Sequence, residues 1–388
     1  MTALIKVLIV DDSPIMRYAI AKHLETDPGL TVVGSAPDGL AALAKIPALT
    51  PDVVALDAEM PGMNSLATLQ QIMRDFPIPV VMLSSLTQHG ANITVQALMQ
   101  GAVDFVKKPV ASTEIRTVVE ELAIKIKAAA RVRSTSTAKK RPVRAYLTTT
   151  VKSNSAEPAK LGLRPFRRGD PVVIIGASTG GPRALQQILS AFPAAFPAAV
   201  VIVQHMPPGF SHYLAQRLNE TCQLTVQEAA DGSRLACGMV LVTPGDVYLR
   251  FKEGDRIFLD QDPHPHHLRP ALDIALESAA KYHGSAVNAI ILTGLGSDGT
   301  RGARIIKAAG GRVIAEDGST SVVCGLPGSV FEAGLADRVK PLPEIAPTVL
   351  ELIAHKNNET AELQPLTTVS SEAAPKGPQA LDIRDGQR

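Results

Sequence analysis

Three residues that could form a nucleophilic catalytic site follow short apolar runs in the second half of the chain. Ser178 lies in Gly-Ala-Ser-Thr-Gly-Gly, His205 in Gln-His-Met, and Asp298 in Thr-Gly-Leu-Gly-Ser-Asp-Gly. A serine needs a base to become a nucleophile, and a histidine base needs a carboxylate to orient it. If the runs are parallel strands, their carboxyl ends meet at one edge of a sheet. The pattern predicts acyl transfer, with Ser178 as nucleophile, His205 as base and Asp298 as orienting carboxylate.

The glycine-rich segment around Ser178 fits two kinds of site. It matches G-x-S-x-G, in which small neighbours permit a sharp strand-to-helix turn that exposes the serine. The alternative is a glycine loop that binds phosphate at a helix N-terminus, although the G-x-G-x-x-G spacing and the P-loop Gly-Lys-Ser/Thr are missing. The chain order Ser, His, Asp also differs from that of the α/β-hydrolases, which excludes a simple assignment to that fold. The segment alone leaves both sites open.

A second group of polar residues lies at the ends of apolar runs in the first half of the chain. These residues are Asp11, Asp12, Asp57, Ser84 and Lys108. Clustered carboxylates repel one another, so we expect Asp11, Asp12 and Asp57 to bind Mg²⁺. Asp57 could then accept a phosphoryl group, with Lys108 stabilising the transferred oxygens and Ser84 responding to the new charge. An acidic pair at a strand end is also typical of a helix N-cap and a solvated rim, but the ordered set predicts a phosphoacceptor site.

Both groups require parallel sheets to bring them together. In the first half, β-branched runs alternate with helical patterns, which predicts a doubly wound five-stranded parallel sheet. The expected strands are Lys6–Val10, Thr31–Gly34, Val53–Leu56, Val80–Leu83 and Asp104–Val106. In the second half we expect an α/β domain with a mainly parallel sheet. Its strands are Val172–Ile175, Val200–Val203, Ala289–Leu292 and Val313–Ala315, with β-hairpins inserted over 224–259.

Composition and charge divide the chain of 388 residues into four parts. Residues 131–168 hold eleven Lys or Arg and one acid, so this stretch carries +10 although the whole chain carries only +2. It lacks apolar periodicity and interleaved aromatic residues, which favours a solvated tether over a nucleic-acid-binding segment. We expect folded domains over 1–128 and 170–354, a basic flexible linker over 129–169 and a disordered tail over 355–388.

The composition also bears on membrane insertion and on the redox state of the compartment. No run approaches the ~18 apolar residues of a membrane span, so direct membrane insertion is not expected. The three cysteines are far apart and odd in number, which argues against a disulfide framework and for a reducing cytoplasm.

The first half resembles the receiver domain of a two-component response regulator. The resemblance covers about residues 4–128 and rests on Val-Asp-Asp-Ser at Asp11, Leu-Asp at Asp57, Ser-Ser at Ser84 and Lys-Pro at Lys108. It implies phosphorylation of Asp57 by a histidine kinase and places Phe105 at the aromatic switch position. Asn64-Ser65 stands where such domains usually have Asp-Gly, which predicts a differently built loop.

The second half, about residues 170–350, resembles the catalytic domain of the chemotaxis protein-glutamate methylesterases. The resemblance rests on the Ser178, His205 and Asp298 motifs together with Arg-Pro-Ala-Leu-Asp at 269–273. It implies hydrolysis of glutamate methyl esters on methyl-accepting chemotaxis receptors, deamidation of particular glutamines, and no cofactor for hydrolysis. It also implies that a CheA-like chemotaxis histidine kinase is a partner. Backbone N–H groups near Leu295, which stands where methionine is expected, would help hold the oxyanion.

In the family that the chain resembles, the receiver domain packs across the catalytic face, and phosphorylation loosens that contact. The resemblance therefore implies an enzyme that its own first domain inhibits.

Two other features remain open. His264, His266 and His267 could bind a metal, but the segment is broken by prolines and lacks cysteine, which favours a mobile loop. Arg269 could contact an acidic receptor segment or form a salt bridge with Asp273.

Two other functions are alternatives to an esterase. A DNA-binding response regulator would need a helix-turn-helix or a basic output domain, which the second half does not show, so nucleic acid is not an expected partner. A binding module with a vestigial triad would release no methanol from methylated receptors.

Overall fold

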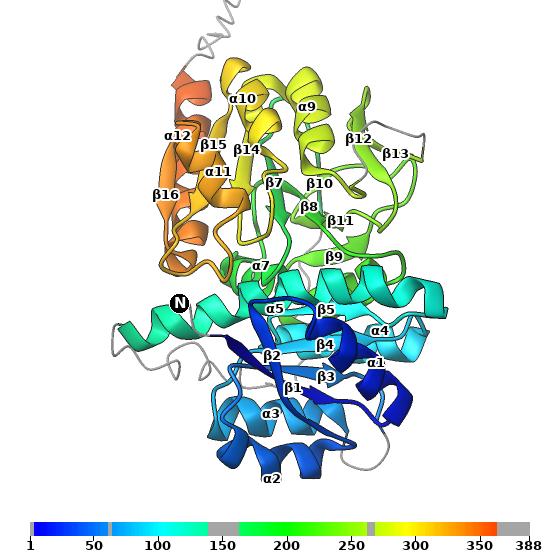
Figure 1. Cartoon of the computed structure of the whole chain (residues 1–388). Helices are drawn as coiled ribbons and strands as arrows, with labels where there is room; N and C mark the ends of the chain where they lie inside the picture. The colour runs from blue at the N-terminus through cyan, green and yellow to red at the C-terminus, as the bar shows by residue number, and fades with distance from the viewer. Residues whose placement is uncertain (1–3, 61–63, 139–162, 262–267, 363–388) are drawn as a thin grey trace, which may run out of the picture.

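The computed structural model describes residues 4–60, 64–138, 163–261 and 268–362 and shows two α/β domains packed side by side (Figure 1). The first domain, drawn in blue to cyan, alternates strands with helices along the chain. Its elements are β1 (Ile5–Val10), α1 (Pro14–Leu24), β2 (Leu30–Ala36), α2 (Gly39–Leu49), β3 (Val53–Asp57), α3 (Ser65–Asp75), β4 (Val80–Ser84), α4 (Gln88–Met99), β5 (Asp104–Lys107), η1 (Ser112–Glu114) and α5 (Ile115–Ala138).

The five strands of the first domain form one parallel sheet in the order β2-β1-β3-β4-β5. Strands β3 and β4 are buried along their whole length, as expected of a sheet covered on both faces. Helices α1 and α5 pack on one face, and α2, α3 and α4 line the other. The predicted doubly wound fold of this domain is confirmed.

The second domain, drawn in green to orange, is larger. Its elements are β6 (Arg164–Pro165), β7 (Val172–Ala177), α7 (Gly181–Ala191), β8 (Ala199–Gln204), α8 (Phe210–Thr221), β9 (Thr225–Glu228), β10 (Ala236–Cys237), β11 (Met239–Val242), β12 (Tyr248–Lys252), β13 (Arg256–Asp260), α9 (Leu272–His283), η2 (Gly284–Ala286), β14 (Val287–Ile291), α10 (Thr300–Ala308), β15 (Arg312–Glu316), α11 (Leu326–Glu332), β16 (Arg338–Lys340) and α12 (Leu342–Glu362).

Seven strands form its main sheet in the order β16-β15-β14-β7-β8-β11-β9, and every pair is parallel. Helices α7, α8 and α12 contribute buried side chains to one face, and α9, α10 and α11 to the other. The expected mainly parallel sheet is confirmed. The expectation for 224–259 was wrong in part, because β9 and β11 join the main sheet as parallel strands and only β12 and β13 form a hairpin.

The expected boundaries of the linker and the tail differ from the structure. Helix α5 continues to Ala138, because Ala128 and Ala129 are buried against the first domain and extend its apolar face. At the other end, β6 pairs antiparallel with β10, so residues 164–165 belong to the second domain. Helix α12 runs to Glu362, eight residues into the expected tail. The central linker, 139–162, lies outside the described residues.

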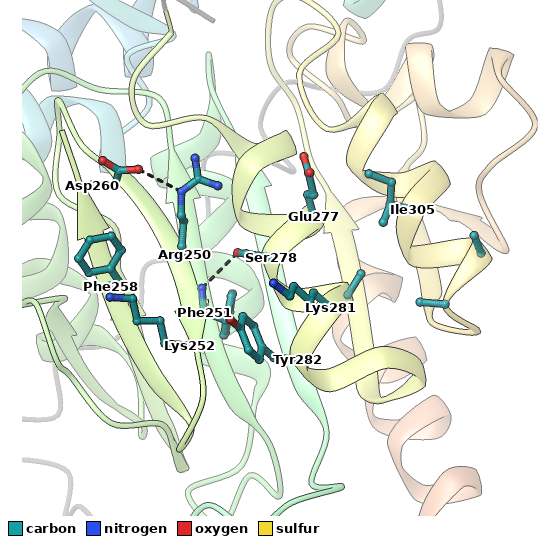
Figure 2. Close-up of a pocket in the computed structure, with 13 residues that line it drawn as sticks. Arg250, Phe251, Lys252, Phe258, Asp260, Glu277, Ser278, Lys281, Tyr282 and Ile305 are labelled. Atoms are coloured by element: carbon teal, nitrogen blue, oxygen red, sulfur yellow. Dashed lines mark hydrogen bonds and ion pairs between the residues drawn. The ribbon is translucent and has the colours of Figure 1, made fainter. Parts of the chain in front are cut away.

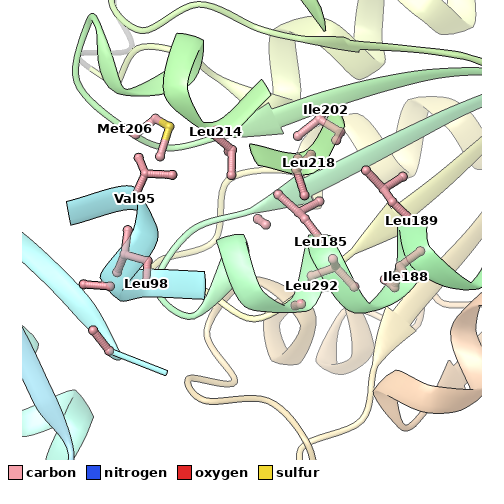
Figure 3. Packing of buried hydrophobic residues seen from close by; sticks show 14 of the residues in the cluster. Val95, Leu98, Leu185, Ile188, Leu189, Ile202, Met206, Leu214, Leu218 and Leu292 are labelled. Carbon is pink, nitrogen blue, oxygen red and sulfur yellow. The ribbon is translucent and has the colours of Figure 1, made fainter. Parts of the chain in front are cut away.

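The two domains share one hydrophobic cluster. Helix α4 of the first domain packs against α7 and α8 of the second. Figure 3 shows Val95 and Leu98 on α4 beside the side chains of Met206 and Leu214. Helix α7 follows β7 and Met206 follows β8, so the interface lies close to the carboxyl ends of these strands.

None of the described helices is long and apolar enough to cross a bilayer. The three cysteines, Cys222, Cys237 and Cys324, are free thiols.

Candidate active site and phosphoacceptor site

The structure brings His205 and Asp298 into contact and places Ser178 beside them. Ser178 follows β7, His205 follows β8 and Asp298 lies in the loop after β14, and these three strands are neighbours in the sheet. The Nε2 atom of His205 lies 2.9 Å from Oδ2 of Asp298. Both side chains are mostly buried, with exposed fractions of 10% and 13%. Since Nε2 faces the carboxylate, Nδ1 is the nitrogen left to take a proton from a nucleophile.

The first turn of α9 holds the Asp298 carboxylate. The backbone N–H of Leu272 donates to Oδ2 at 2.6 Å, and that of Asp273 donates to Oδ1 at 2.9 Å. Burial acts to raise the pKa of Asp298, but hydrogen bonds from His205 and these two N–H groups outweigh it and hold the pKa below its usual value. Asp298 is therefore ionised at neutral pH and suited to orient the imidazole.

Ser178 sits on a sharp turn between β7 and α7. Gly180 has a φ of +81°, a left-handed conformation that permits the turn and favours glycine. Gly294 lets the opposite loop approach, because a Cβ there would lie 2.6 Å from Cβ of Ser178. Among the described residues no hydrogen bond joins the Ser178 hydroxyl to His205, so the serine is near its base but not engaged with it.

Gln204 is a site residue to which the sequence analysis assigned no role. Its buried side-chain amide donates from Nε2 to the carbonyls of Ser178 at 2.9 Å and His205 at 3.1 Å. The amide thus ties the nucleophile turn to the histidine turn. A polar residue at the end of a buried strand, directly before His205, could have indicated this role from the sequence.

Leu295, expected near the oxyanion, lies half-buried in the loop after β14. The preceding N–H, that of Gly294, donates to the carbonyl of Val323 at 2.9 Å and is therefore already engaged. This leaves the part of the loop at Leu295 and Gly296, where φ is +88°, to face a reacting carbonyl.

Of the two roles left open for Arg269, the salt bridge with Asp273 does not form among the described residues. The guanidinium of Arg269 lies over the ring of Tyr248 and 3.7 Å from Oδ1 of Asp246. Asp273 instead accepts hydrogen bonds from the N–H groups of Gly299 and Gly302 at the start of α10. Both bonds end on Oδ1 of Asp273, and its Oδ2 lies 3.8 Å from Nε of Arg301. His264, His266 and His267 lie outside the described residues.

In the first domain, Lys108 joins two buried carboxylates. Its Nζ lies 2.7 Å from Oδ2 of Asp11 and 2.7 Å from Oδ2 of Asp57. Carboxylate oxygens of Asp11, Asp12 and Asp57 all lie within 4.8 Å of one another. Burial raises the pKa of Asp57 to about 6 despite the opposing effect of Lys108, so one ammonium does not neutralise the cluster. A hard divalent cation with oxygen ligands fits this donor set.

Ser84 ends β4 and Phe105 lies in the neighbouring strand β5, and the register of the two strands puts both on the same face of the sheet. The Ser84 hydroxyl donates to the carbonyl of Ser85 at 3.1 Å and accepts from the hydroxyl of Thr94 at 2.6 Å. The ring of Phe105 stacks on Phe210 of the second domain, with centroids 4.6 Å apart. Of the two expected switch residues, Ser84 therefore contacts α4 and Phe105 contacts the second domain. Asn64 caps α3 through the N–H of Ala67, so the unusual Asn-Ser pair forms an ordinary helix start.

An open pocket of about 860 Å³ lies elsewhere, between the β12–β13 hairpin and α9 (Figure 2). Arg250, Lys252 and Lys281 line it together with aromatic rings. It contains none of the predicted catalytic residues, so the chemistry of the chain is not placed there.

Comparisons with known proteins identify both domains. Residues 173–349 match the CheB methylesterase family, and residues 7–120 match the response regulator receiver domain family. The chain is 44% identical to a protein-glutamate methylesterase/protein-glutamine glutaminase of Thermotoga maritima, over 90% of this chain and 98% of that protein. It is 45% identical to the protein of the same name from Symbiobacterium thermophilum, over 90% and 97%.

A solved structure, the catalytic domain of Thermotoga maritima CheB methylesterase, is 48% identical and covers 47% of this chain and 98% of that one, with a TM-score of 0.46. The extent of the two family matches and the identity to full-length relatives decide the assignment. The chain belongs to the CheB family of protein-glutamate methylesterases/protein-glutamine glutaminases, which join a response regulator receiver domain to a hydrolase domain.

Proposed function

We propose that the chain hydrolyses glutamate methyl esters on methyl-accepting chemotaxis receptors through Ser178, His205 and Asp298, and so serves sensory adaptation. The observation that carries this is the 2.9 Å contact between His205 and Asp298 at the ends of strands that flank the Ser178 turn. Deamidation of receptor glutamines needs the same acyl-enzyme, with ammonia leaving in place of methanol.

The reaction proceeds in two steps. Nδ1 of His205 takes the hydroxyl proton as Oγ of Ser178 attacks the ester carbonyl, and the imidazolium then gives that proton to the departing methanol. Water, activated by the same nitrogen, cleaves the acyl-serine and leaves the glutamate carboxylate. Backbone N–H groups at Leu295 stabilise the oxyanion in both steps, and no cofactor takes part in the hydrolysis.

Methanol release from methylated receptor membranes tests the reaction. Ser178→Ala removes the nucleophile and only one atom, so release should fall to the residual rate that binding and oxyanion stabilisation provide. The purified full chain and the variant should have the same thermal unfolding curve. A variant that releases methanol at the full rate would contradict the acyl-enzyme.

We further propose that phosphorylation of Asp57 by a CheA-like chemotaxis histidine kinase controls this activity in the cytoplasm. Asp11, Asp12 and Asp57 would hold Mg²⁺, and the bound metal would supply positive charge to the phosphoryl oxygens. Lys108, Ser84 and Phe105 would respond to the new charge. Phosphoryl label from a small phosphodonor should appear on the unaltered chain with Mg²⁺ and be lost in Asp57→Asn.

The contacts between the domains support inhibition by the receiver domain. The hydroxyl of Thr179, next to the nucleophile, donates to Asp104, and the N–H of Gly180 donates to the carbonyl of Val103 at 3.0 Å. Met206, next to the base, is buried in the cluster that includes Val95 of α4. The receiver domain thus contacts residues adjacent to both Ser178 and His205, and phosphorylation would act by weakening these contacts.

A shortened chain tests this regulation. A fragment that begins at residue 163, and so keeps β6 paired with β10, should release methanol faster than the unphosphorylated full chain. A phosphodonor should stimulate the full chain and leave the fragment unchanged. Equal rates for the fragment and the unphosphorylated full chain would rule out inhibition by the receiver domain.

A further inference from the structure

Glu316 is a buried carboxylate that the proposed reaction does not use. It ends β15, the neighbour of β14, and 2% of the residue is exposed. Its Oε2 accepts a hydrogen bond from the backbone N–H of Thr293 at 2.8 Å, and its Oε1 accepts one from the hydroxyl of Thr320 at 3.0 Å. The carboxylate is therefore directed at the residue that begins the loop carrying Leu295 and Asp298.

Thr293 connects Glu316 to the nucleophile turn. Its carbonyl accepts the backbone N–H of Ser178 at 3.0 Å, and its hydroxyl donates to the carbonyl of Thr179 at 2.9 Å. The same hydroxyl accepts the N–H of Val323 at 3.0 Å. Every polar group of Thr293 is thus engaged, and two of them hold the turn on which the nucleophile sits.

Burying a carboxylate costs free energy of desolvation, and here two hydrogen bonds act against it. Burial raises the pKa of Glu316 to about 7, because the hydrogen bonds from Thr293 and Thr320 offset only part of the desolvation. An apolar side chain in place of Glu316 would leave the N–H of Thr293 without this acceptor, so Thr293 could tilt and its carbonyl, which accepts from Ser178, would move with it. A displacement of this kind at a catalytic turn reduces the rate more than it reduces substrate binding.

We propose that Glu316 is a positioning residue for Ser178, acting through Thr293. The inference rests on the proposed function, since it presumes that Ser178 is the nucleophile. It places no group of Glu316 in contact with the substrate, so the expected effect is on kcat and not on KM.

The test compares three substitutions in the phosphorylated full chain, assayed for methanol release from methylated receptor membranes. Glu316→Leu removes the acceptor while filling most of the space, and kcat should fall by ~10- to 100-fold with KM changed by less than about twofold. Glu316→Gln keeps an oxygen that can accept from Thr293, and kcat should stay within about threefold of the unaltered chain. Asp317→Asn, which removes the adjacent charge outside the contact with Thr293, is the matched control and should leave kcat unchanged.

A second readout reports on the serine without the receptor. The rate at which a fluorophosphonate probe labels Ser178 should fall in Glu316→Leu and recover in Glu316→Gln. If Glu316→Leu does not fold, Glu316→Met replaces it, because this unbranched side chain of similar length also removes the acceptor of the Thr293 N–H and should slow labelling by about tenfold. Normal labelling and kcat in folded Glu316→Leu, or in Glu316→Met used in its place, would overturn the proposal. Equal losses in Glu316→Leu and Glu316→Gln would also overturn it.

Ser178→Ala separates this outcome from failure of the proposed function. If Ser178→Ala remains active and the probe labels another residue, the nucleophile assignment fails. If Ser178→Ala is inactive and Glu316→Leu is as fast as the unaltered chain, only the role of Glu316 fails.

Discussion

The phosphoacceptor site and the hydrolytic site both lie at the carboxyl ends of parallel strands, but their key carboxylates are stabilised differently. Asp57 is buried with Asp11 and shares the single ammonium of Lys108, and its pKa is raised to about 6. Asp298 accepts two backbone N–H groups and a histidine, and its pKa is lowered. The first site holds one ammonium against three carboxylates, whereas the protein's own hydrogen bonds keep the carboxylate of the second site ionised.

This difference matches what each carboxylate is proposed to do. A phosphoacceptor needs a cation during transfer, so a cluster that one lysine cannot neutralise favours Mg²⁺ binding. An orienting carboxylate must stay ionised while the histidine gains and loses a proton, so fixed hydrogen bonds serve it better than a mobile ion. Equivalent positions in two parallel sheets therefore have different chemistry because different groups surround them.

The largest expected effect comes from removing the charge of Asp298. Asp298→Asn should lower kcat for methanol release by ~10³- to 10⁴-fold, because the amide no longer stabilises the imidazolium and favours the wrong tautomer. The variant keeps one of the two oxygens that accept from the N–H groups of α9, so a thermal unfolding curve accompanies the assay and should show a folded protein. Glu253→Gln, in the exposed turn between β12 and β13, is the control and should retain full activity. A loss of less than tenfold in Asp298→Asn would show that the second site does not depend on this charge.

A smaller effect is expected on the stability of the receiver domain without metal. Because the folded pKa of Asp57, about 6, lies above its unfolded value of 3.8, the stability from the protonated carboxyl is present below about pH 4 and is lost as pH rises through 6. In EDTA, Asp57→Asn should therefore stabilise the domain at pH 7 by up to about 3 kcal/mol and have little effect at pH 4.

Urea unfolding of the full chain, followed by circular dichroism, measures this difference. Mg²⁺ should stabilise the unaltered chain more than Asp57→Asn, since the metal replaces the missing positive charge. Asp12→Asn is the control for charge alone, because Asp12 is exposed and its substitution should change the stability less. Equal stability of Asp57→Asn and the unaltered chain at pH 7 without metal would remove the proposed difference between the two sites.

The smallest expected effect concerns the contact that joins the two sites. Phe105→Ala removes the stack on Phe210, which is worth about 1 kcal/mol, so the unphosphorylated full chain should become roughly fivefold more active. Stimulation by a phosphodonor should shrink by the same factor. Tyr18→Ala, on the exposed surface of α1, is the control and should change neither rate. An unchanged basal rate in Phe105→Ala would show that this stack does not hold the inhibited form.

Much of the fold followed from local patterns. The apolar runs that predict β1, β3, β4, β7, β8 and β14 are buried strands in the structure, because a parallel strand covered on both faces must be apolar throughout. Residues 225–242 were misassigned as hairpins, because turns such as Asp231-Gly232 are compatible with a crossover as well as a hairpin. The linker boundary was also misplaced, since the burial of Ala128 and Ala129 depends on contacts that the sequence does not display.

The residues that reach each sheet edge could be predicted from the chain, since strand length, loop position and parallel order decide where Asp57, Ser178 and His205 emerge. The groups that surround them at that edge could not. Three contacts join segments that are distant in the chain or belong to different domains. They are the hydrogen bond from α9 to Asp298, the stack of Phe105 on Phe210 and the hydrogen bond from Thr293 to Glu316. Such contacts depend on how whole elements pack, and packing is a property of three-dimensional shape that no local spacing of residues encodes.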